Sequence, residues 1–111
     1  MKNIEQIQKL SVLHCIYQVI ASADGSVVEE RDQLAIDFAL DELGLPSVYS
    51  WDSALHLNPH DCFFHISTLG NDEKQLFIAL LLKIAGMGGN TAFRIICAKH
   101  VFQFCSIDSL I

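Results

Sequence analysis

The sequence predicts an all-α protein, a compact bundle of about five to seven helices. Apolar residues recur at spacings of three and four in most of the chain, which is the period of one helix face. No segment alternates apolar and polar residues for long, and no hairpin dipeptide separates two apolar runs. Glycine, proline and asparagine fall between the periodic segments, where helices start and stop.

The first helix is expected over residues 3–23. Its apolar residues lie three or four apart on one face: Ile4, Ile7, Leu10, Leu13, Tyr17 and Ile20. Val12, Ile16 and Val19 widen this stripe, so we expect the helix to be central in the bundle. Gly25 can adopt a positive φ and is expected to end it.

The second helix is expected over residues 29–43. One face carries Leu34, Phe38 and either Ala35 or Leu43, with Asp32, Asp37 and Asp41 elsewhere. We expect that face to be buried. Gly44 follows the last apolar residue and Pro46 comes two residues later, which is typical of a helix C-terminus.

A short helix is expected over residues 47–57, with Val48, Trp51 and Leu55 on one side. Asn58 and Pro59 then have the pattern of an N-cap followed by proline at the first helical position. They open a helix that is expected to run to Leu69. Gly70 closes that helix, and Asn71 is expected to cap the next one.

Residues 76–87 are apolar nearly all round, so their helix is expected to be the most buried in the protein. Gly88 and Gly89 end it. The last helix is expected over residues 91–104, and its apolar stripe consists of Phe93, Ile96, Cys97, His100, Val101 and Phe104. The stripe marks the face by which this helix is expected to pack.

The chain of 111 residues has the size of one domain, residues 1–111, with room for a single hydrophobic core. Apolar residues make up 51% of it and the mean hydropathy is positive, so some apolar surface is expected to be left for a partner. The net charge is −6 and there is no basic run, which argues against binding to nucleic acid.

Charged and polar residues interrupt the N-terminal segment, so no signal peptide is expected. The longest apolar run, residues 76–87, is broken by Lys83 and is shorter than the ~18–20 residues of a membrane span. We therefore expect a cytoplasmic protein. The cysteines, at 15, 62, 97 and 105, form no C-x-x-C pair and are expected to be small buried hydrophobic residues.

The two halves of the sequence contain similar segments at their helix-helix turns. Residues 20–25, Ile-Ala-Ser-Ala-Asp-Gly, align with residues 84–89, Ile-Ala-Gly-Met-Gly-Gly. The second copy keeps the glycine but has no acid, because Gly88 stands in place of Asp24 and Arg94 in place of Glu30. The sequence thus predicts two pseudo-repeated helix-turn-helix units, of which the first carries an acidic turn.

The first turn is similar to the hallmark of the TerB-like family, which is named after a bacterial tellurite-resistance protein. The hallmark residues present here are Ala23, Asp24, Gly25, Val27 and Glu30. The resemblance implies an all-α domain over the whole chain, a role in bacterial stress responses and no established enzymatic activity. It also implies that acidic residues bind metal ions, although the second Asp-Gly turn of the family is missing.

Asp24, Glu29 and Glu30 are the candidate metal ligands. Three carboxylates in one turn offer oxygen ligands to a divalent cation, but fewer than the ~6–8 that calcium takes. The alternative is structural: Asp24 caps free N–H groups, and the two glutamates complement the dipole of the second helix. Both explanations stay open, and no cofactor besides a divalent cation is expected.

Three further patterns have simpler explanations. One is the group His56, His60, Cys62 and His65. Zinc would need more ligands, so surface or half-buried histidines are favoured. Residues 86–89 are glycine-rich but follow a helix, which favours a helix–helix turn over a dinucleotide-binding loop. His14 and Cys15 are adjacent, so a helix directs their side chains apart and no catalytic pair is indicated.

The favoured function is an interaction or stress-response module that binds a divalent cation weakly at the acidic turn. The second hypothesis is a ligand-free homodimeric helical scaffold, because the apolar content is high. The third is an enzyme of unknown class, for which no motif identifies a reaction.

Overall fold

Helices form the regular structure of the protein. The computed structural model describes residues 1–21, 32–46 and 52–110, and no strand occurs in these ranges. The helices are α1 (Gln6–Ala21), α2 (Gln33–Leu43), α4 (Pro59–Ser67), α5 (Asn71–Ala85), α6 (Thr91–Phe104) and a 3₁₀ helix, η2 (Asp108–Leu110). The prediction of an all-α bundle of five to seven helices is confirmed. Residues 52–55, within the expected short helix, are helical as well.

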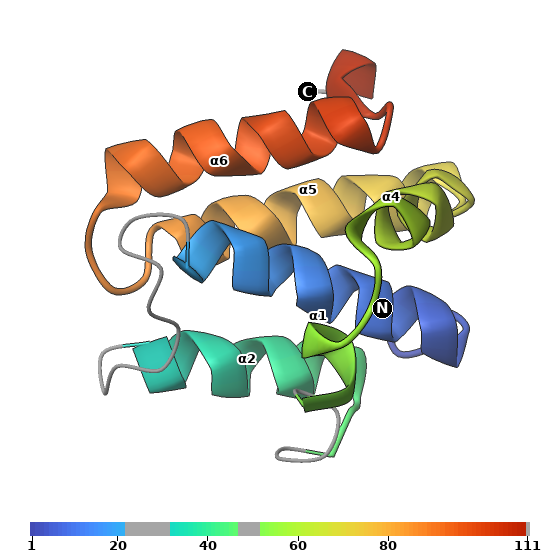
Figure 1. Cartoon of the computed structure of the whole chain (residues 1–111), viewed down its shortest axis with the longest axis horizontal. Helices are drawn as coiled ribbons and strands as arrows, with labels where there is room; N and C mark the ends of the chain where they lie inside the picture. The colour runs from blue at the N-terminus through green and yellow to red at the C-terminus, as the bar shows by residue number, and fades with distance from the viewer. Residues whose placement is uncertain (22–31, 47–51, 111) are drawn as a thin grey trace.

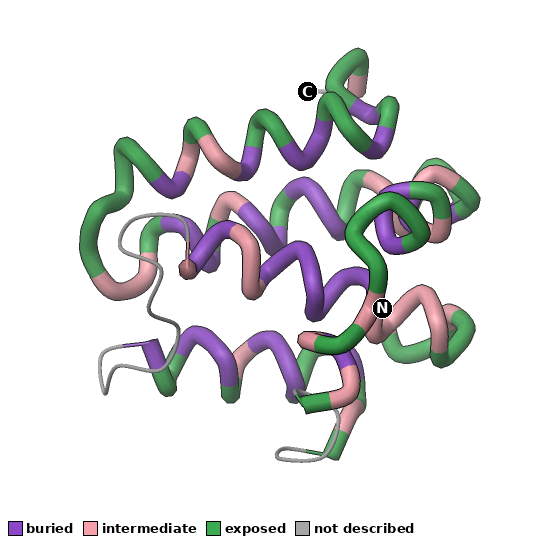
Figure 2. The backbone as a smooth tube through the Cα atoms, in the orientation of Figure 1, coloured by how far each residue is buried: buried purple, intermediate pink, exposed green. Residues whose placement is uncertain are grey.

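The bundle is built around α1, which packs against α2, α4, α5 and α6. Figure 1 shows α6 and α2 on opposite sides, with α1 and α5 between them. The residues from Ser11 to Ile16 are all buried, and Figure 2 shows how burial concentrates on α1 and on the inward sides of its neighbours. The predicted central position of the first helix is confirmed.

The expectation that residues 76–87 form the most buried helix is wrong. In α5 the side chain of Leu76 is 51% exposed and Ala79 is exposed too, whereas α1 is covered on several sides. An apolar helix in a small bundle cannot bury its whole circumference, because a domain of this size has too few neighbours to cover it. Of the helices that the structure describes, none has the length and apolar character needed to cross a membrane.

The buried face of α2 also differs from the prediction. It consists of Ala35, Ile36, Ala39, Leu40 and Leu43. Leu34 is 73% exposed, and Phe38 is half-buried. The face that packs inward contains two alanines, whose small side chains let a helix lie close to its neighbours. The prediction followed the larger side chains and so chose a face rotated away from the core.

Gly44 ends α2 as predicted. It adopts a left-handed conformation with φ 66°, and the next residue, Leu45, donates its backbone N–H to the carbonyl oxygen of Leu40 at 3.0 Å. This is the Schellman arrangement, in which a residue with positive φ lets the chain turn back onto the last carbonyls of the helix.

The start of α4 is confirmed, and the start of α5 is corrected. The side-chain oxygen of Asn58 accepts hydrogen bonds from the backbone N–H groups of His60 and Asp61 at 2.9 and 3.3 Å, so Asn58 is the N-cap. At α5, however, Asn71 is the first helical residue. Gly70 occupies the N-cap position, and it has no side chain that could accept a hydrogen bond from the first N–H groups of the helix.

Replacing Gly44 with alanine is expected to lower the free energy of unfolding by about 1 kcal/mol, because a side chain is disfavoured at positive φ. An added Cβ would also lie 3.2 Å from Cγ of Lys2. Gly86→Ala is the matched control: its φ is −83° and an added Cβ makes only ordinary contacts. Urea denaturation followed by circular dichroism measures both variants. Equal losses would contradict the role of positive φ at Gly44.

Candidate functional site

The predicted acidic turn lies outside the described residues. This applies to Asp24, Glu29 and Glu30, the candidate metal ligands, and to Gly25. Binding of a divalent cation there therefore stays a prediction. The structure does describe both flanks of the segment, namely Ile20 near the end of α1 and Asp32 just before α2. Both flanking residues, Ile20 and Asp32, accept hydrogen bonds from one side chain in the C-terminal half of the protein.

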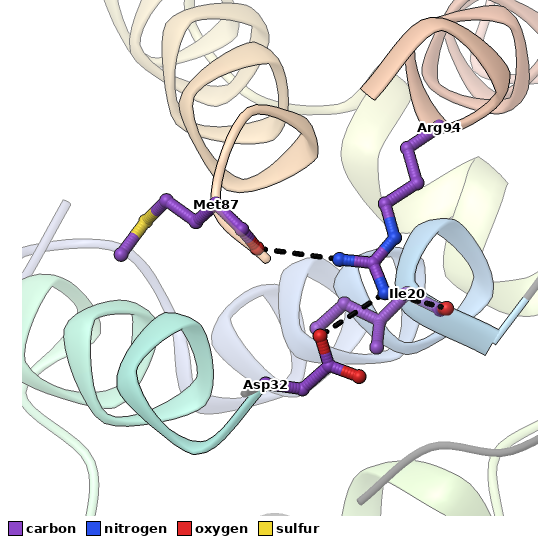
Figure 3. A network of polar contacts seen from close by, with 4 residues as sticks. All are labelled: Ile20, Asp32, Met87 and Arg94. Carbon is purple, nitrogen blue, oxygen red and sulfur yellow. Dashed lines mark hydrogen bonds and ion pairs between the residues drawn. The ribbon is translucent and has the colours of Figure 1, made fainter. Parts of the chain in front are cut away.

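That side chain is Arg94, in the first turn of α6, and it is completely buried. Its Nη2 donates to Oδ1 of Asp32 at 3.0 Å and to the carbonyl oxygen of Ile20 at 3.4 Å. Its Nη1 donates to the carbonyl oxygen of Met87 at 3.3 Å. Figure 3 shows the guanidinium between these three oxygens. Asp32, which was expected to lie off the buried face of its helix, is instead 0% exposed.

The position of the guanidinium follows from the chemistry of helix ends. The last carbonyls of a helix have no partner within the helix, and they carry the negative end of the helix dipole. Ile20 belongs to the last turn of α1, and Met87 follows the end of α5. Arg94 therefore satisfies one carbonyl at the end of each helix, and Asp32 compensates its charge. One side chain thus connects the ends of α1, α2, α5 and α6.

Both side chains of this network are buried. Nε of Arg94 and Oδ2 of Asp32 have no hydrogen-bond partner among the described residues, and neither residue lines either of the two hollows described below. A buried ion pair of this kind adds little net stability, because the cost of burying both charges offsets most of their attraction. We interpret Arg94 and Asp32 as an architectural contact between the two predicted repeat units.

The second turn joins α5 to α6, as the glycine-rich pattern predicted. Gly88 and Gly89 adopt φ of 116° and 97°, and Asn90 follows with φ 53° as the N-cap of α6. Such values favour glycine and tolerate asparagine. The glycines therefore serve the turn itself, and they direct Arg94 toward the carbonyl of Met87.

The members of the histidine group differ in burial and partners. In residues 1–21, 32–46 and 52–110, no three His, Cys, Asp or Glu side chains lie close enough together to hold a metal ion. His56 and His60 are exposed, His65 is half-buried, and Cys62 is buried. Nδ1 of His56 donates to the carbonyl oxygen of Asp52 at 2.8 Å. The interpretation of these residues as surface or half-buried histidines is confirmed.

Three of the cysteines lie in the interior, as predicted, and Cys97 is half-buried. A hydrogen bond with the thiol of Cys105, together with burial, raises the pKa of Cys15 well above its ordinary value. Burial also raises the pKa of Cys62, and a hydrogen bond with Ser11 offsets part of that rise. These thiols stay protonated at neutral pH and are poor nucleophiles.

His14 is buried next to Cys15 but is held by another group. Its Nδ1 lies 2.9 Å from the carbonyl oxygen of Ala54, and since a carbonyl only accepts, Nδ1 carries the proton. This hydrogen bond connects α1 to the helical residues 52–55. The two adjacent side chains thus have separate partners, which agrees with the expectation that they do not act as a pair.

The apolar stripe predicted for α6 does not face the core. The buried residues of α6 are Arg94, Ala98, Val101 and Phe102. Of the predicted stripe only Val101 belongs to this set, while Phe93, Ile96 and Phe104 are 48%, 53% and 64% exposed. The helix is apolar on two sides, and the inward side is the one that brings Arg94 to Asp32.

We call the outward set the α6 face; it comprises Phe93, Ile96, Cys97, His100 and Phe104. The ring of Phe104 stacks on the ring of Phe63 from α4, with centroids 5.2 Å apart and an interplanar angle of 19°. A hollow of about 200 Å³ runs between this face and α1, lined by Gln18, Cys97, His100, Val101 and Phe104. The α6 face is therefore a partly grooved apolar surface.

A second hollow, of about 260 Å³, lies between α2 and α5. Two charged residues, Glu42 and Lys83, belong to its lining, and Nζ of Lys83 sits 4.3 Å from the ring centroid of Phe38. The exposed Leu76 lines it as well. Its lining thus combines apolar side chains with two charged ones, whereas no Asp, Glu, Lys or Arg belongs to the α6 face.

Sequence reasoning missed both the Arg94 network and the outward direction of the α6 face. One signal was present for the first: Arg94 is a lone charge between apolar residues in a helix. No comparable signal was present for the direction of the α6 face, because apolar residues at helical spacing occur both in hydrophobic cores and in interaction surfaces. Comparisons of the chain with protein-family models, with curated proteins and with solved structures gave no match.

Proposed function

We propose that the protein is a helical interaction domain and that its α6 face binds a helix of another protein chain. The observation that carries this proposal is the exposure of Phe93, Ile96 and Phe104 in one row on a helix that already has a separate buried face. Exposed apolar patches of this kind on small proteins mark interaction sites. Aromatic residues are also enriched in the centres of protein interfaces.

The spacing within the α6 face favours a helix as the partner. Phe93, Cys97, His100 and Phe104 follow one another at intervals of four, three and four. This is the repeat of positions d, a, d and a in a coiled coil, whose side chains insert between those of a facing helix. The hollow beside Cys97 and Phe104 offers space for such a side chain. An extended peptide would not match a 3.5-residue repeat.

The family resemblance and the cation belong to this proposal in different ways. A TerB-like domain in a stress response would act through partners, so the resemblance agrees with an interaction role but names no partner. Weak binding of a divalent cation by Asp24, Glu29 and Glu30 is a separate prediction. The contacts of the α6 face neither require it nor bear on it.

The test uses Cys97 as a built-in attachment point. It is the only cysteine that is not buried, so a maleimide that carries a photoreactive benzophenone is expected to label it selectively in the folded protein. Illumination in an extract of the source cells should give an adduct of defined mass. Phe93→Lys should reduce the yield of that adduct about 10-fold, since burying a charge in an apolar interface is costly.

The matched control moves the label to the opposite side of the molecule. Leu34 is 73% exposed on α2, so the variant Cys97→Ser with Leu34→Cys carries the same reagent away from the α6 face. It should give no adduct of the same mass. If no adduct depends on Phe93, the α6 face is not an interaction surface and the proposed function fails.

A further inference from the structure

We infer that the helix that binds the α6 face is α6 of a second copy of this chain, lying antiparallel across a twofold axis. This inference rests on the proposed function and names its partner. Two properties of the face support self-pairing over pairing with an unrelated helix: the symmetry of its spacing and its lack of carboxylates.

The row on the α6 face has the same spacing in both directions. Intervals of four, three and four are unchanged on reversal, and phenylalanine stands at both ends of the row. In an antiparallel pair with the axis midway along the row, Phe93 faces Phe104 of the second copy, and Cys97 faces His100 of the second copy. Each of these contacts therefore occurs twice, as a self-complementary twofold interface requires.

The charges of the protein also favour this face for self-pairing. The chain has 13 acidic and 7 basic residues, so two copies repel each other over most of their surface. Residues 90–107 contain no aspartate or glutamate. Lys99 lies outside the row at this spacing, and Arg94 is neutralised by Asp32 in the interior. Two copies therefore meet through α6 without bringing carboxylates together.

The exposed apolar residue of α2 does not share this property. On α2 the exposed Leu34 lies on the same helix as Asp37, Asp41 and Glu42, all of them exposed. Pairing of α2 with α2 of a second copy would concentrate these carboxylates in one interface, where like charges are destabilising. Leu34 is consequently the right position for a control substitution.

The size of the surface sets the expected affinity. A standard interface buries about 800 Å² on each partner, which is roughly a seventh of the 5836 Å² surface of this chain. The 14 residues of α6 span about 21 Å. One helix pair, extended by the hollow next to α1, falls short of a standard interface. We therefore expect a reversible dimer with a Kd on the order of 10 µM.

Sedimentation velocity between about 1 and 500 µM tests the dimer, a range that brackets the expected Kd. The wild-type mass should rise from 12.4 kDa toward twice that value. Phe93→Lys and Ile96→Lys should each raise the Kd about 10-fold or more. Leu34→Lys should leave it unchanged. All three positions are exposed, so the variants are expected to keep the fold, which circular dichroism verifies. A monomer at every concentration, or a dimer indifferent to Phe93→Lys, overturns the inference.

Cross-linking tests the orientation in a Cys97→Ser background. Ala92 and Gln103 are both exposed and lie near opposite ends of the row. In an antiparallel pair, a mixture of Ala92→Cys and Gln103→Cys proteins should give a dimer with a short bis-maleimide reagent. Each variant alone should give far less. Efficient cross-linking of each variant with itself would show a parallel pair and would overturn the inference.

The two proposals fail in distinguishable ways. If the purified protein is monomeric but the labelled Cys97 forms a Phe93-dependent adduct with a different protein, the proposed function stands and self-pairing is wrong. If there is neither a dimer nor such an adduct, both are wrong. An adduct of twice the chain mass supports both.

Discussion

Replacing Arg94 with methionine is expected to lower the free energy of unfolding by about 3–5 kcal/mol. The substitution keeps the approximate length of the side chain but removes the guanidinium. It leaves the Asp32 carboxylate buried without its partner, and the carbonyl oxygens of Ile20 and Met87 lose their donors. A typical domain has only about 5–15 kcal/mol of stability, so this one change removes a large share. Urea denaturation followed by circular dichroism measures the loss.

The double variant Arg94→Met with Asp32→Leu shows how much of this loss comes from leaving the Asp32 carboxylate buried and unpaired. It removes both buried charges, so it is expected to be more stable than Arg94→Met alone by at least about 1 kcal/mol. Lys99→Met is the matched control on the same helix, and because Lys99 is exposed, its effect should stay within about 0.5 kcal/mol. A loss below about 1 kcal/mol for Arg94→Met would show that the network does not hold the helix ends together.

Local chemistry explains which features the sequence could predict. The end of α2 at Gly44 and the start of α4 at Asn58 each depend on neighbouring residues alone, because a positive φ or a short polar side chain acts within one turn. The bounds of α6, residues 91–104, agree with the prediction for the same reason. The central position of α1 followed from its broad apolar stripe.

The direction of helix faces could not be predicted in the same way. α6 has apolar residues nearly all round, so periodicity allowed two orientations, and the prediction took the one with larger side chains. The choice depends on Asp32, which is 62 residues away in sequence and accepts a hydrogen bond from Arg94. α2 presents a similar case, since its alanines rather than Leu34 face the core. In both helices the deciding contact is tertiary, and a single sequence does not contain it.

The two faces of α6 can be compared directly with one chemical change. Phe102→Ala is expected to lower the free energy of unfolding by about 3–5 kcal/mol, because it leaves a cavity in the core. Phe102 is 0% exposed and meets the ring of Phe77 edge-on, with centroids 6.0 Å apart. Phe104→Ala, two residues later, should lower it by only about 1 kcal/mol, the value of one stacked contact with Phe63.

The order of the two effects is expected to be reversed for dimer formation, where Phe104→Ala should have the larger effect. Phe104 belongs to the α6 face and is 64% exposed, so Phe104→Ala should weaken the dimer about 10-fold while most of the stability remains. Urea denaturation at low protein concentration gives the stability of the monomer, and sedimentation gives the Kd. If Phe104→Ala destabilised the monomer as much as Phe102→Ala, Phe104 would be part of the core. Phe104 would then be needed for folding, and its exposure would no longer support the α6 face as an interaction surface.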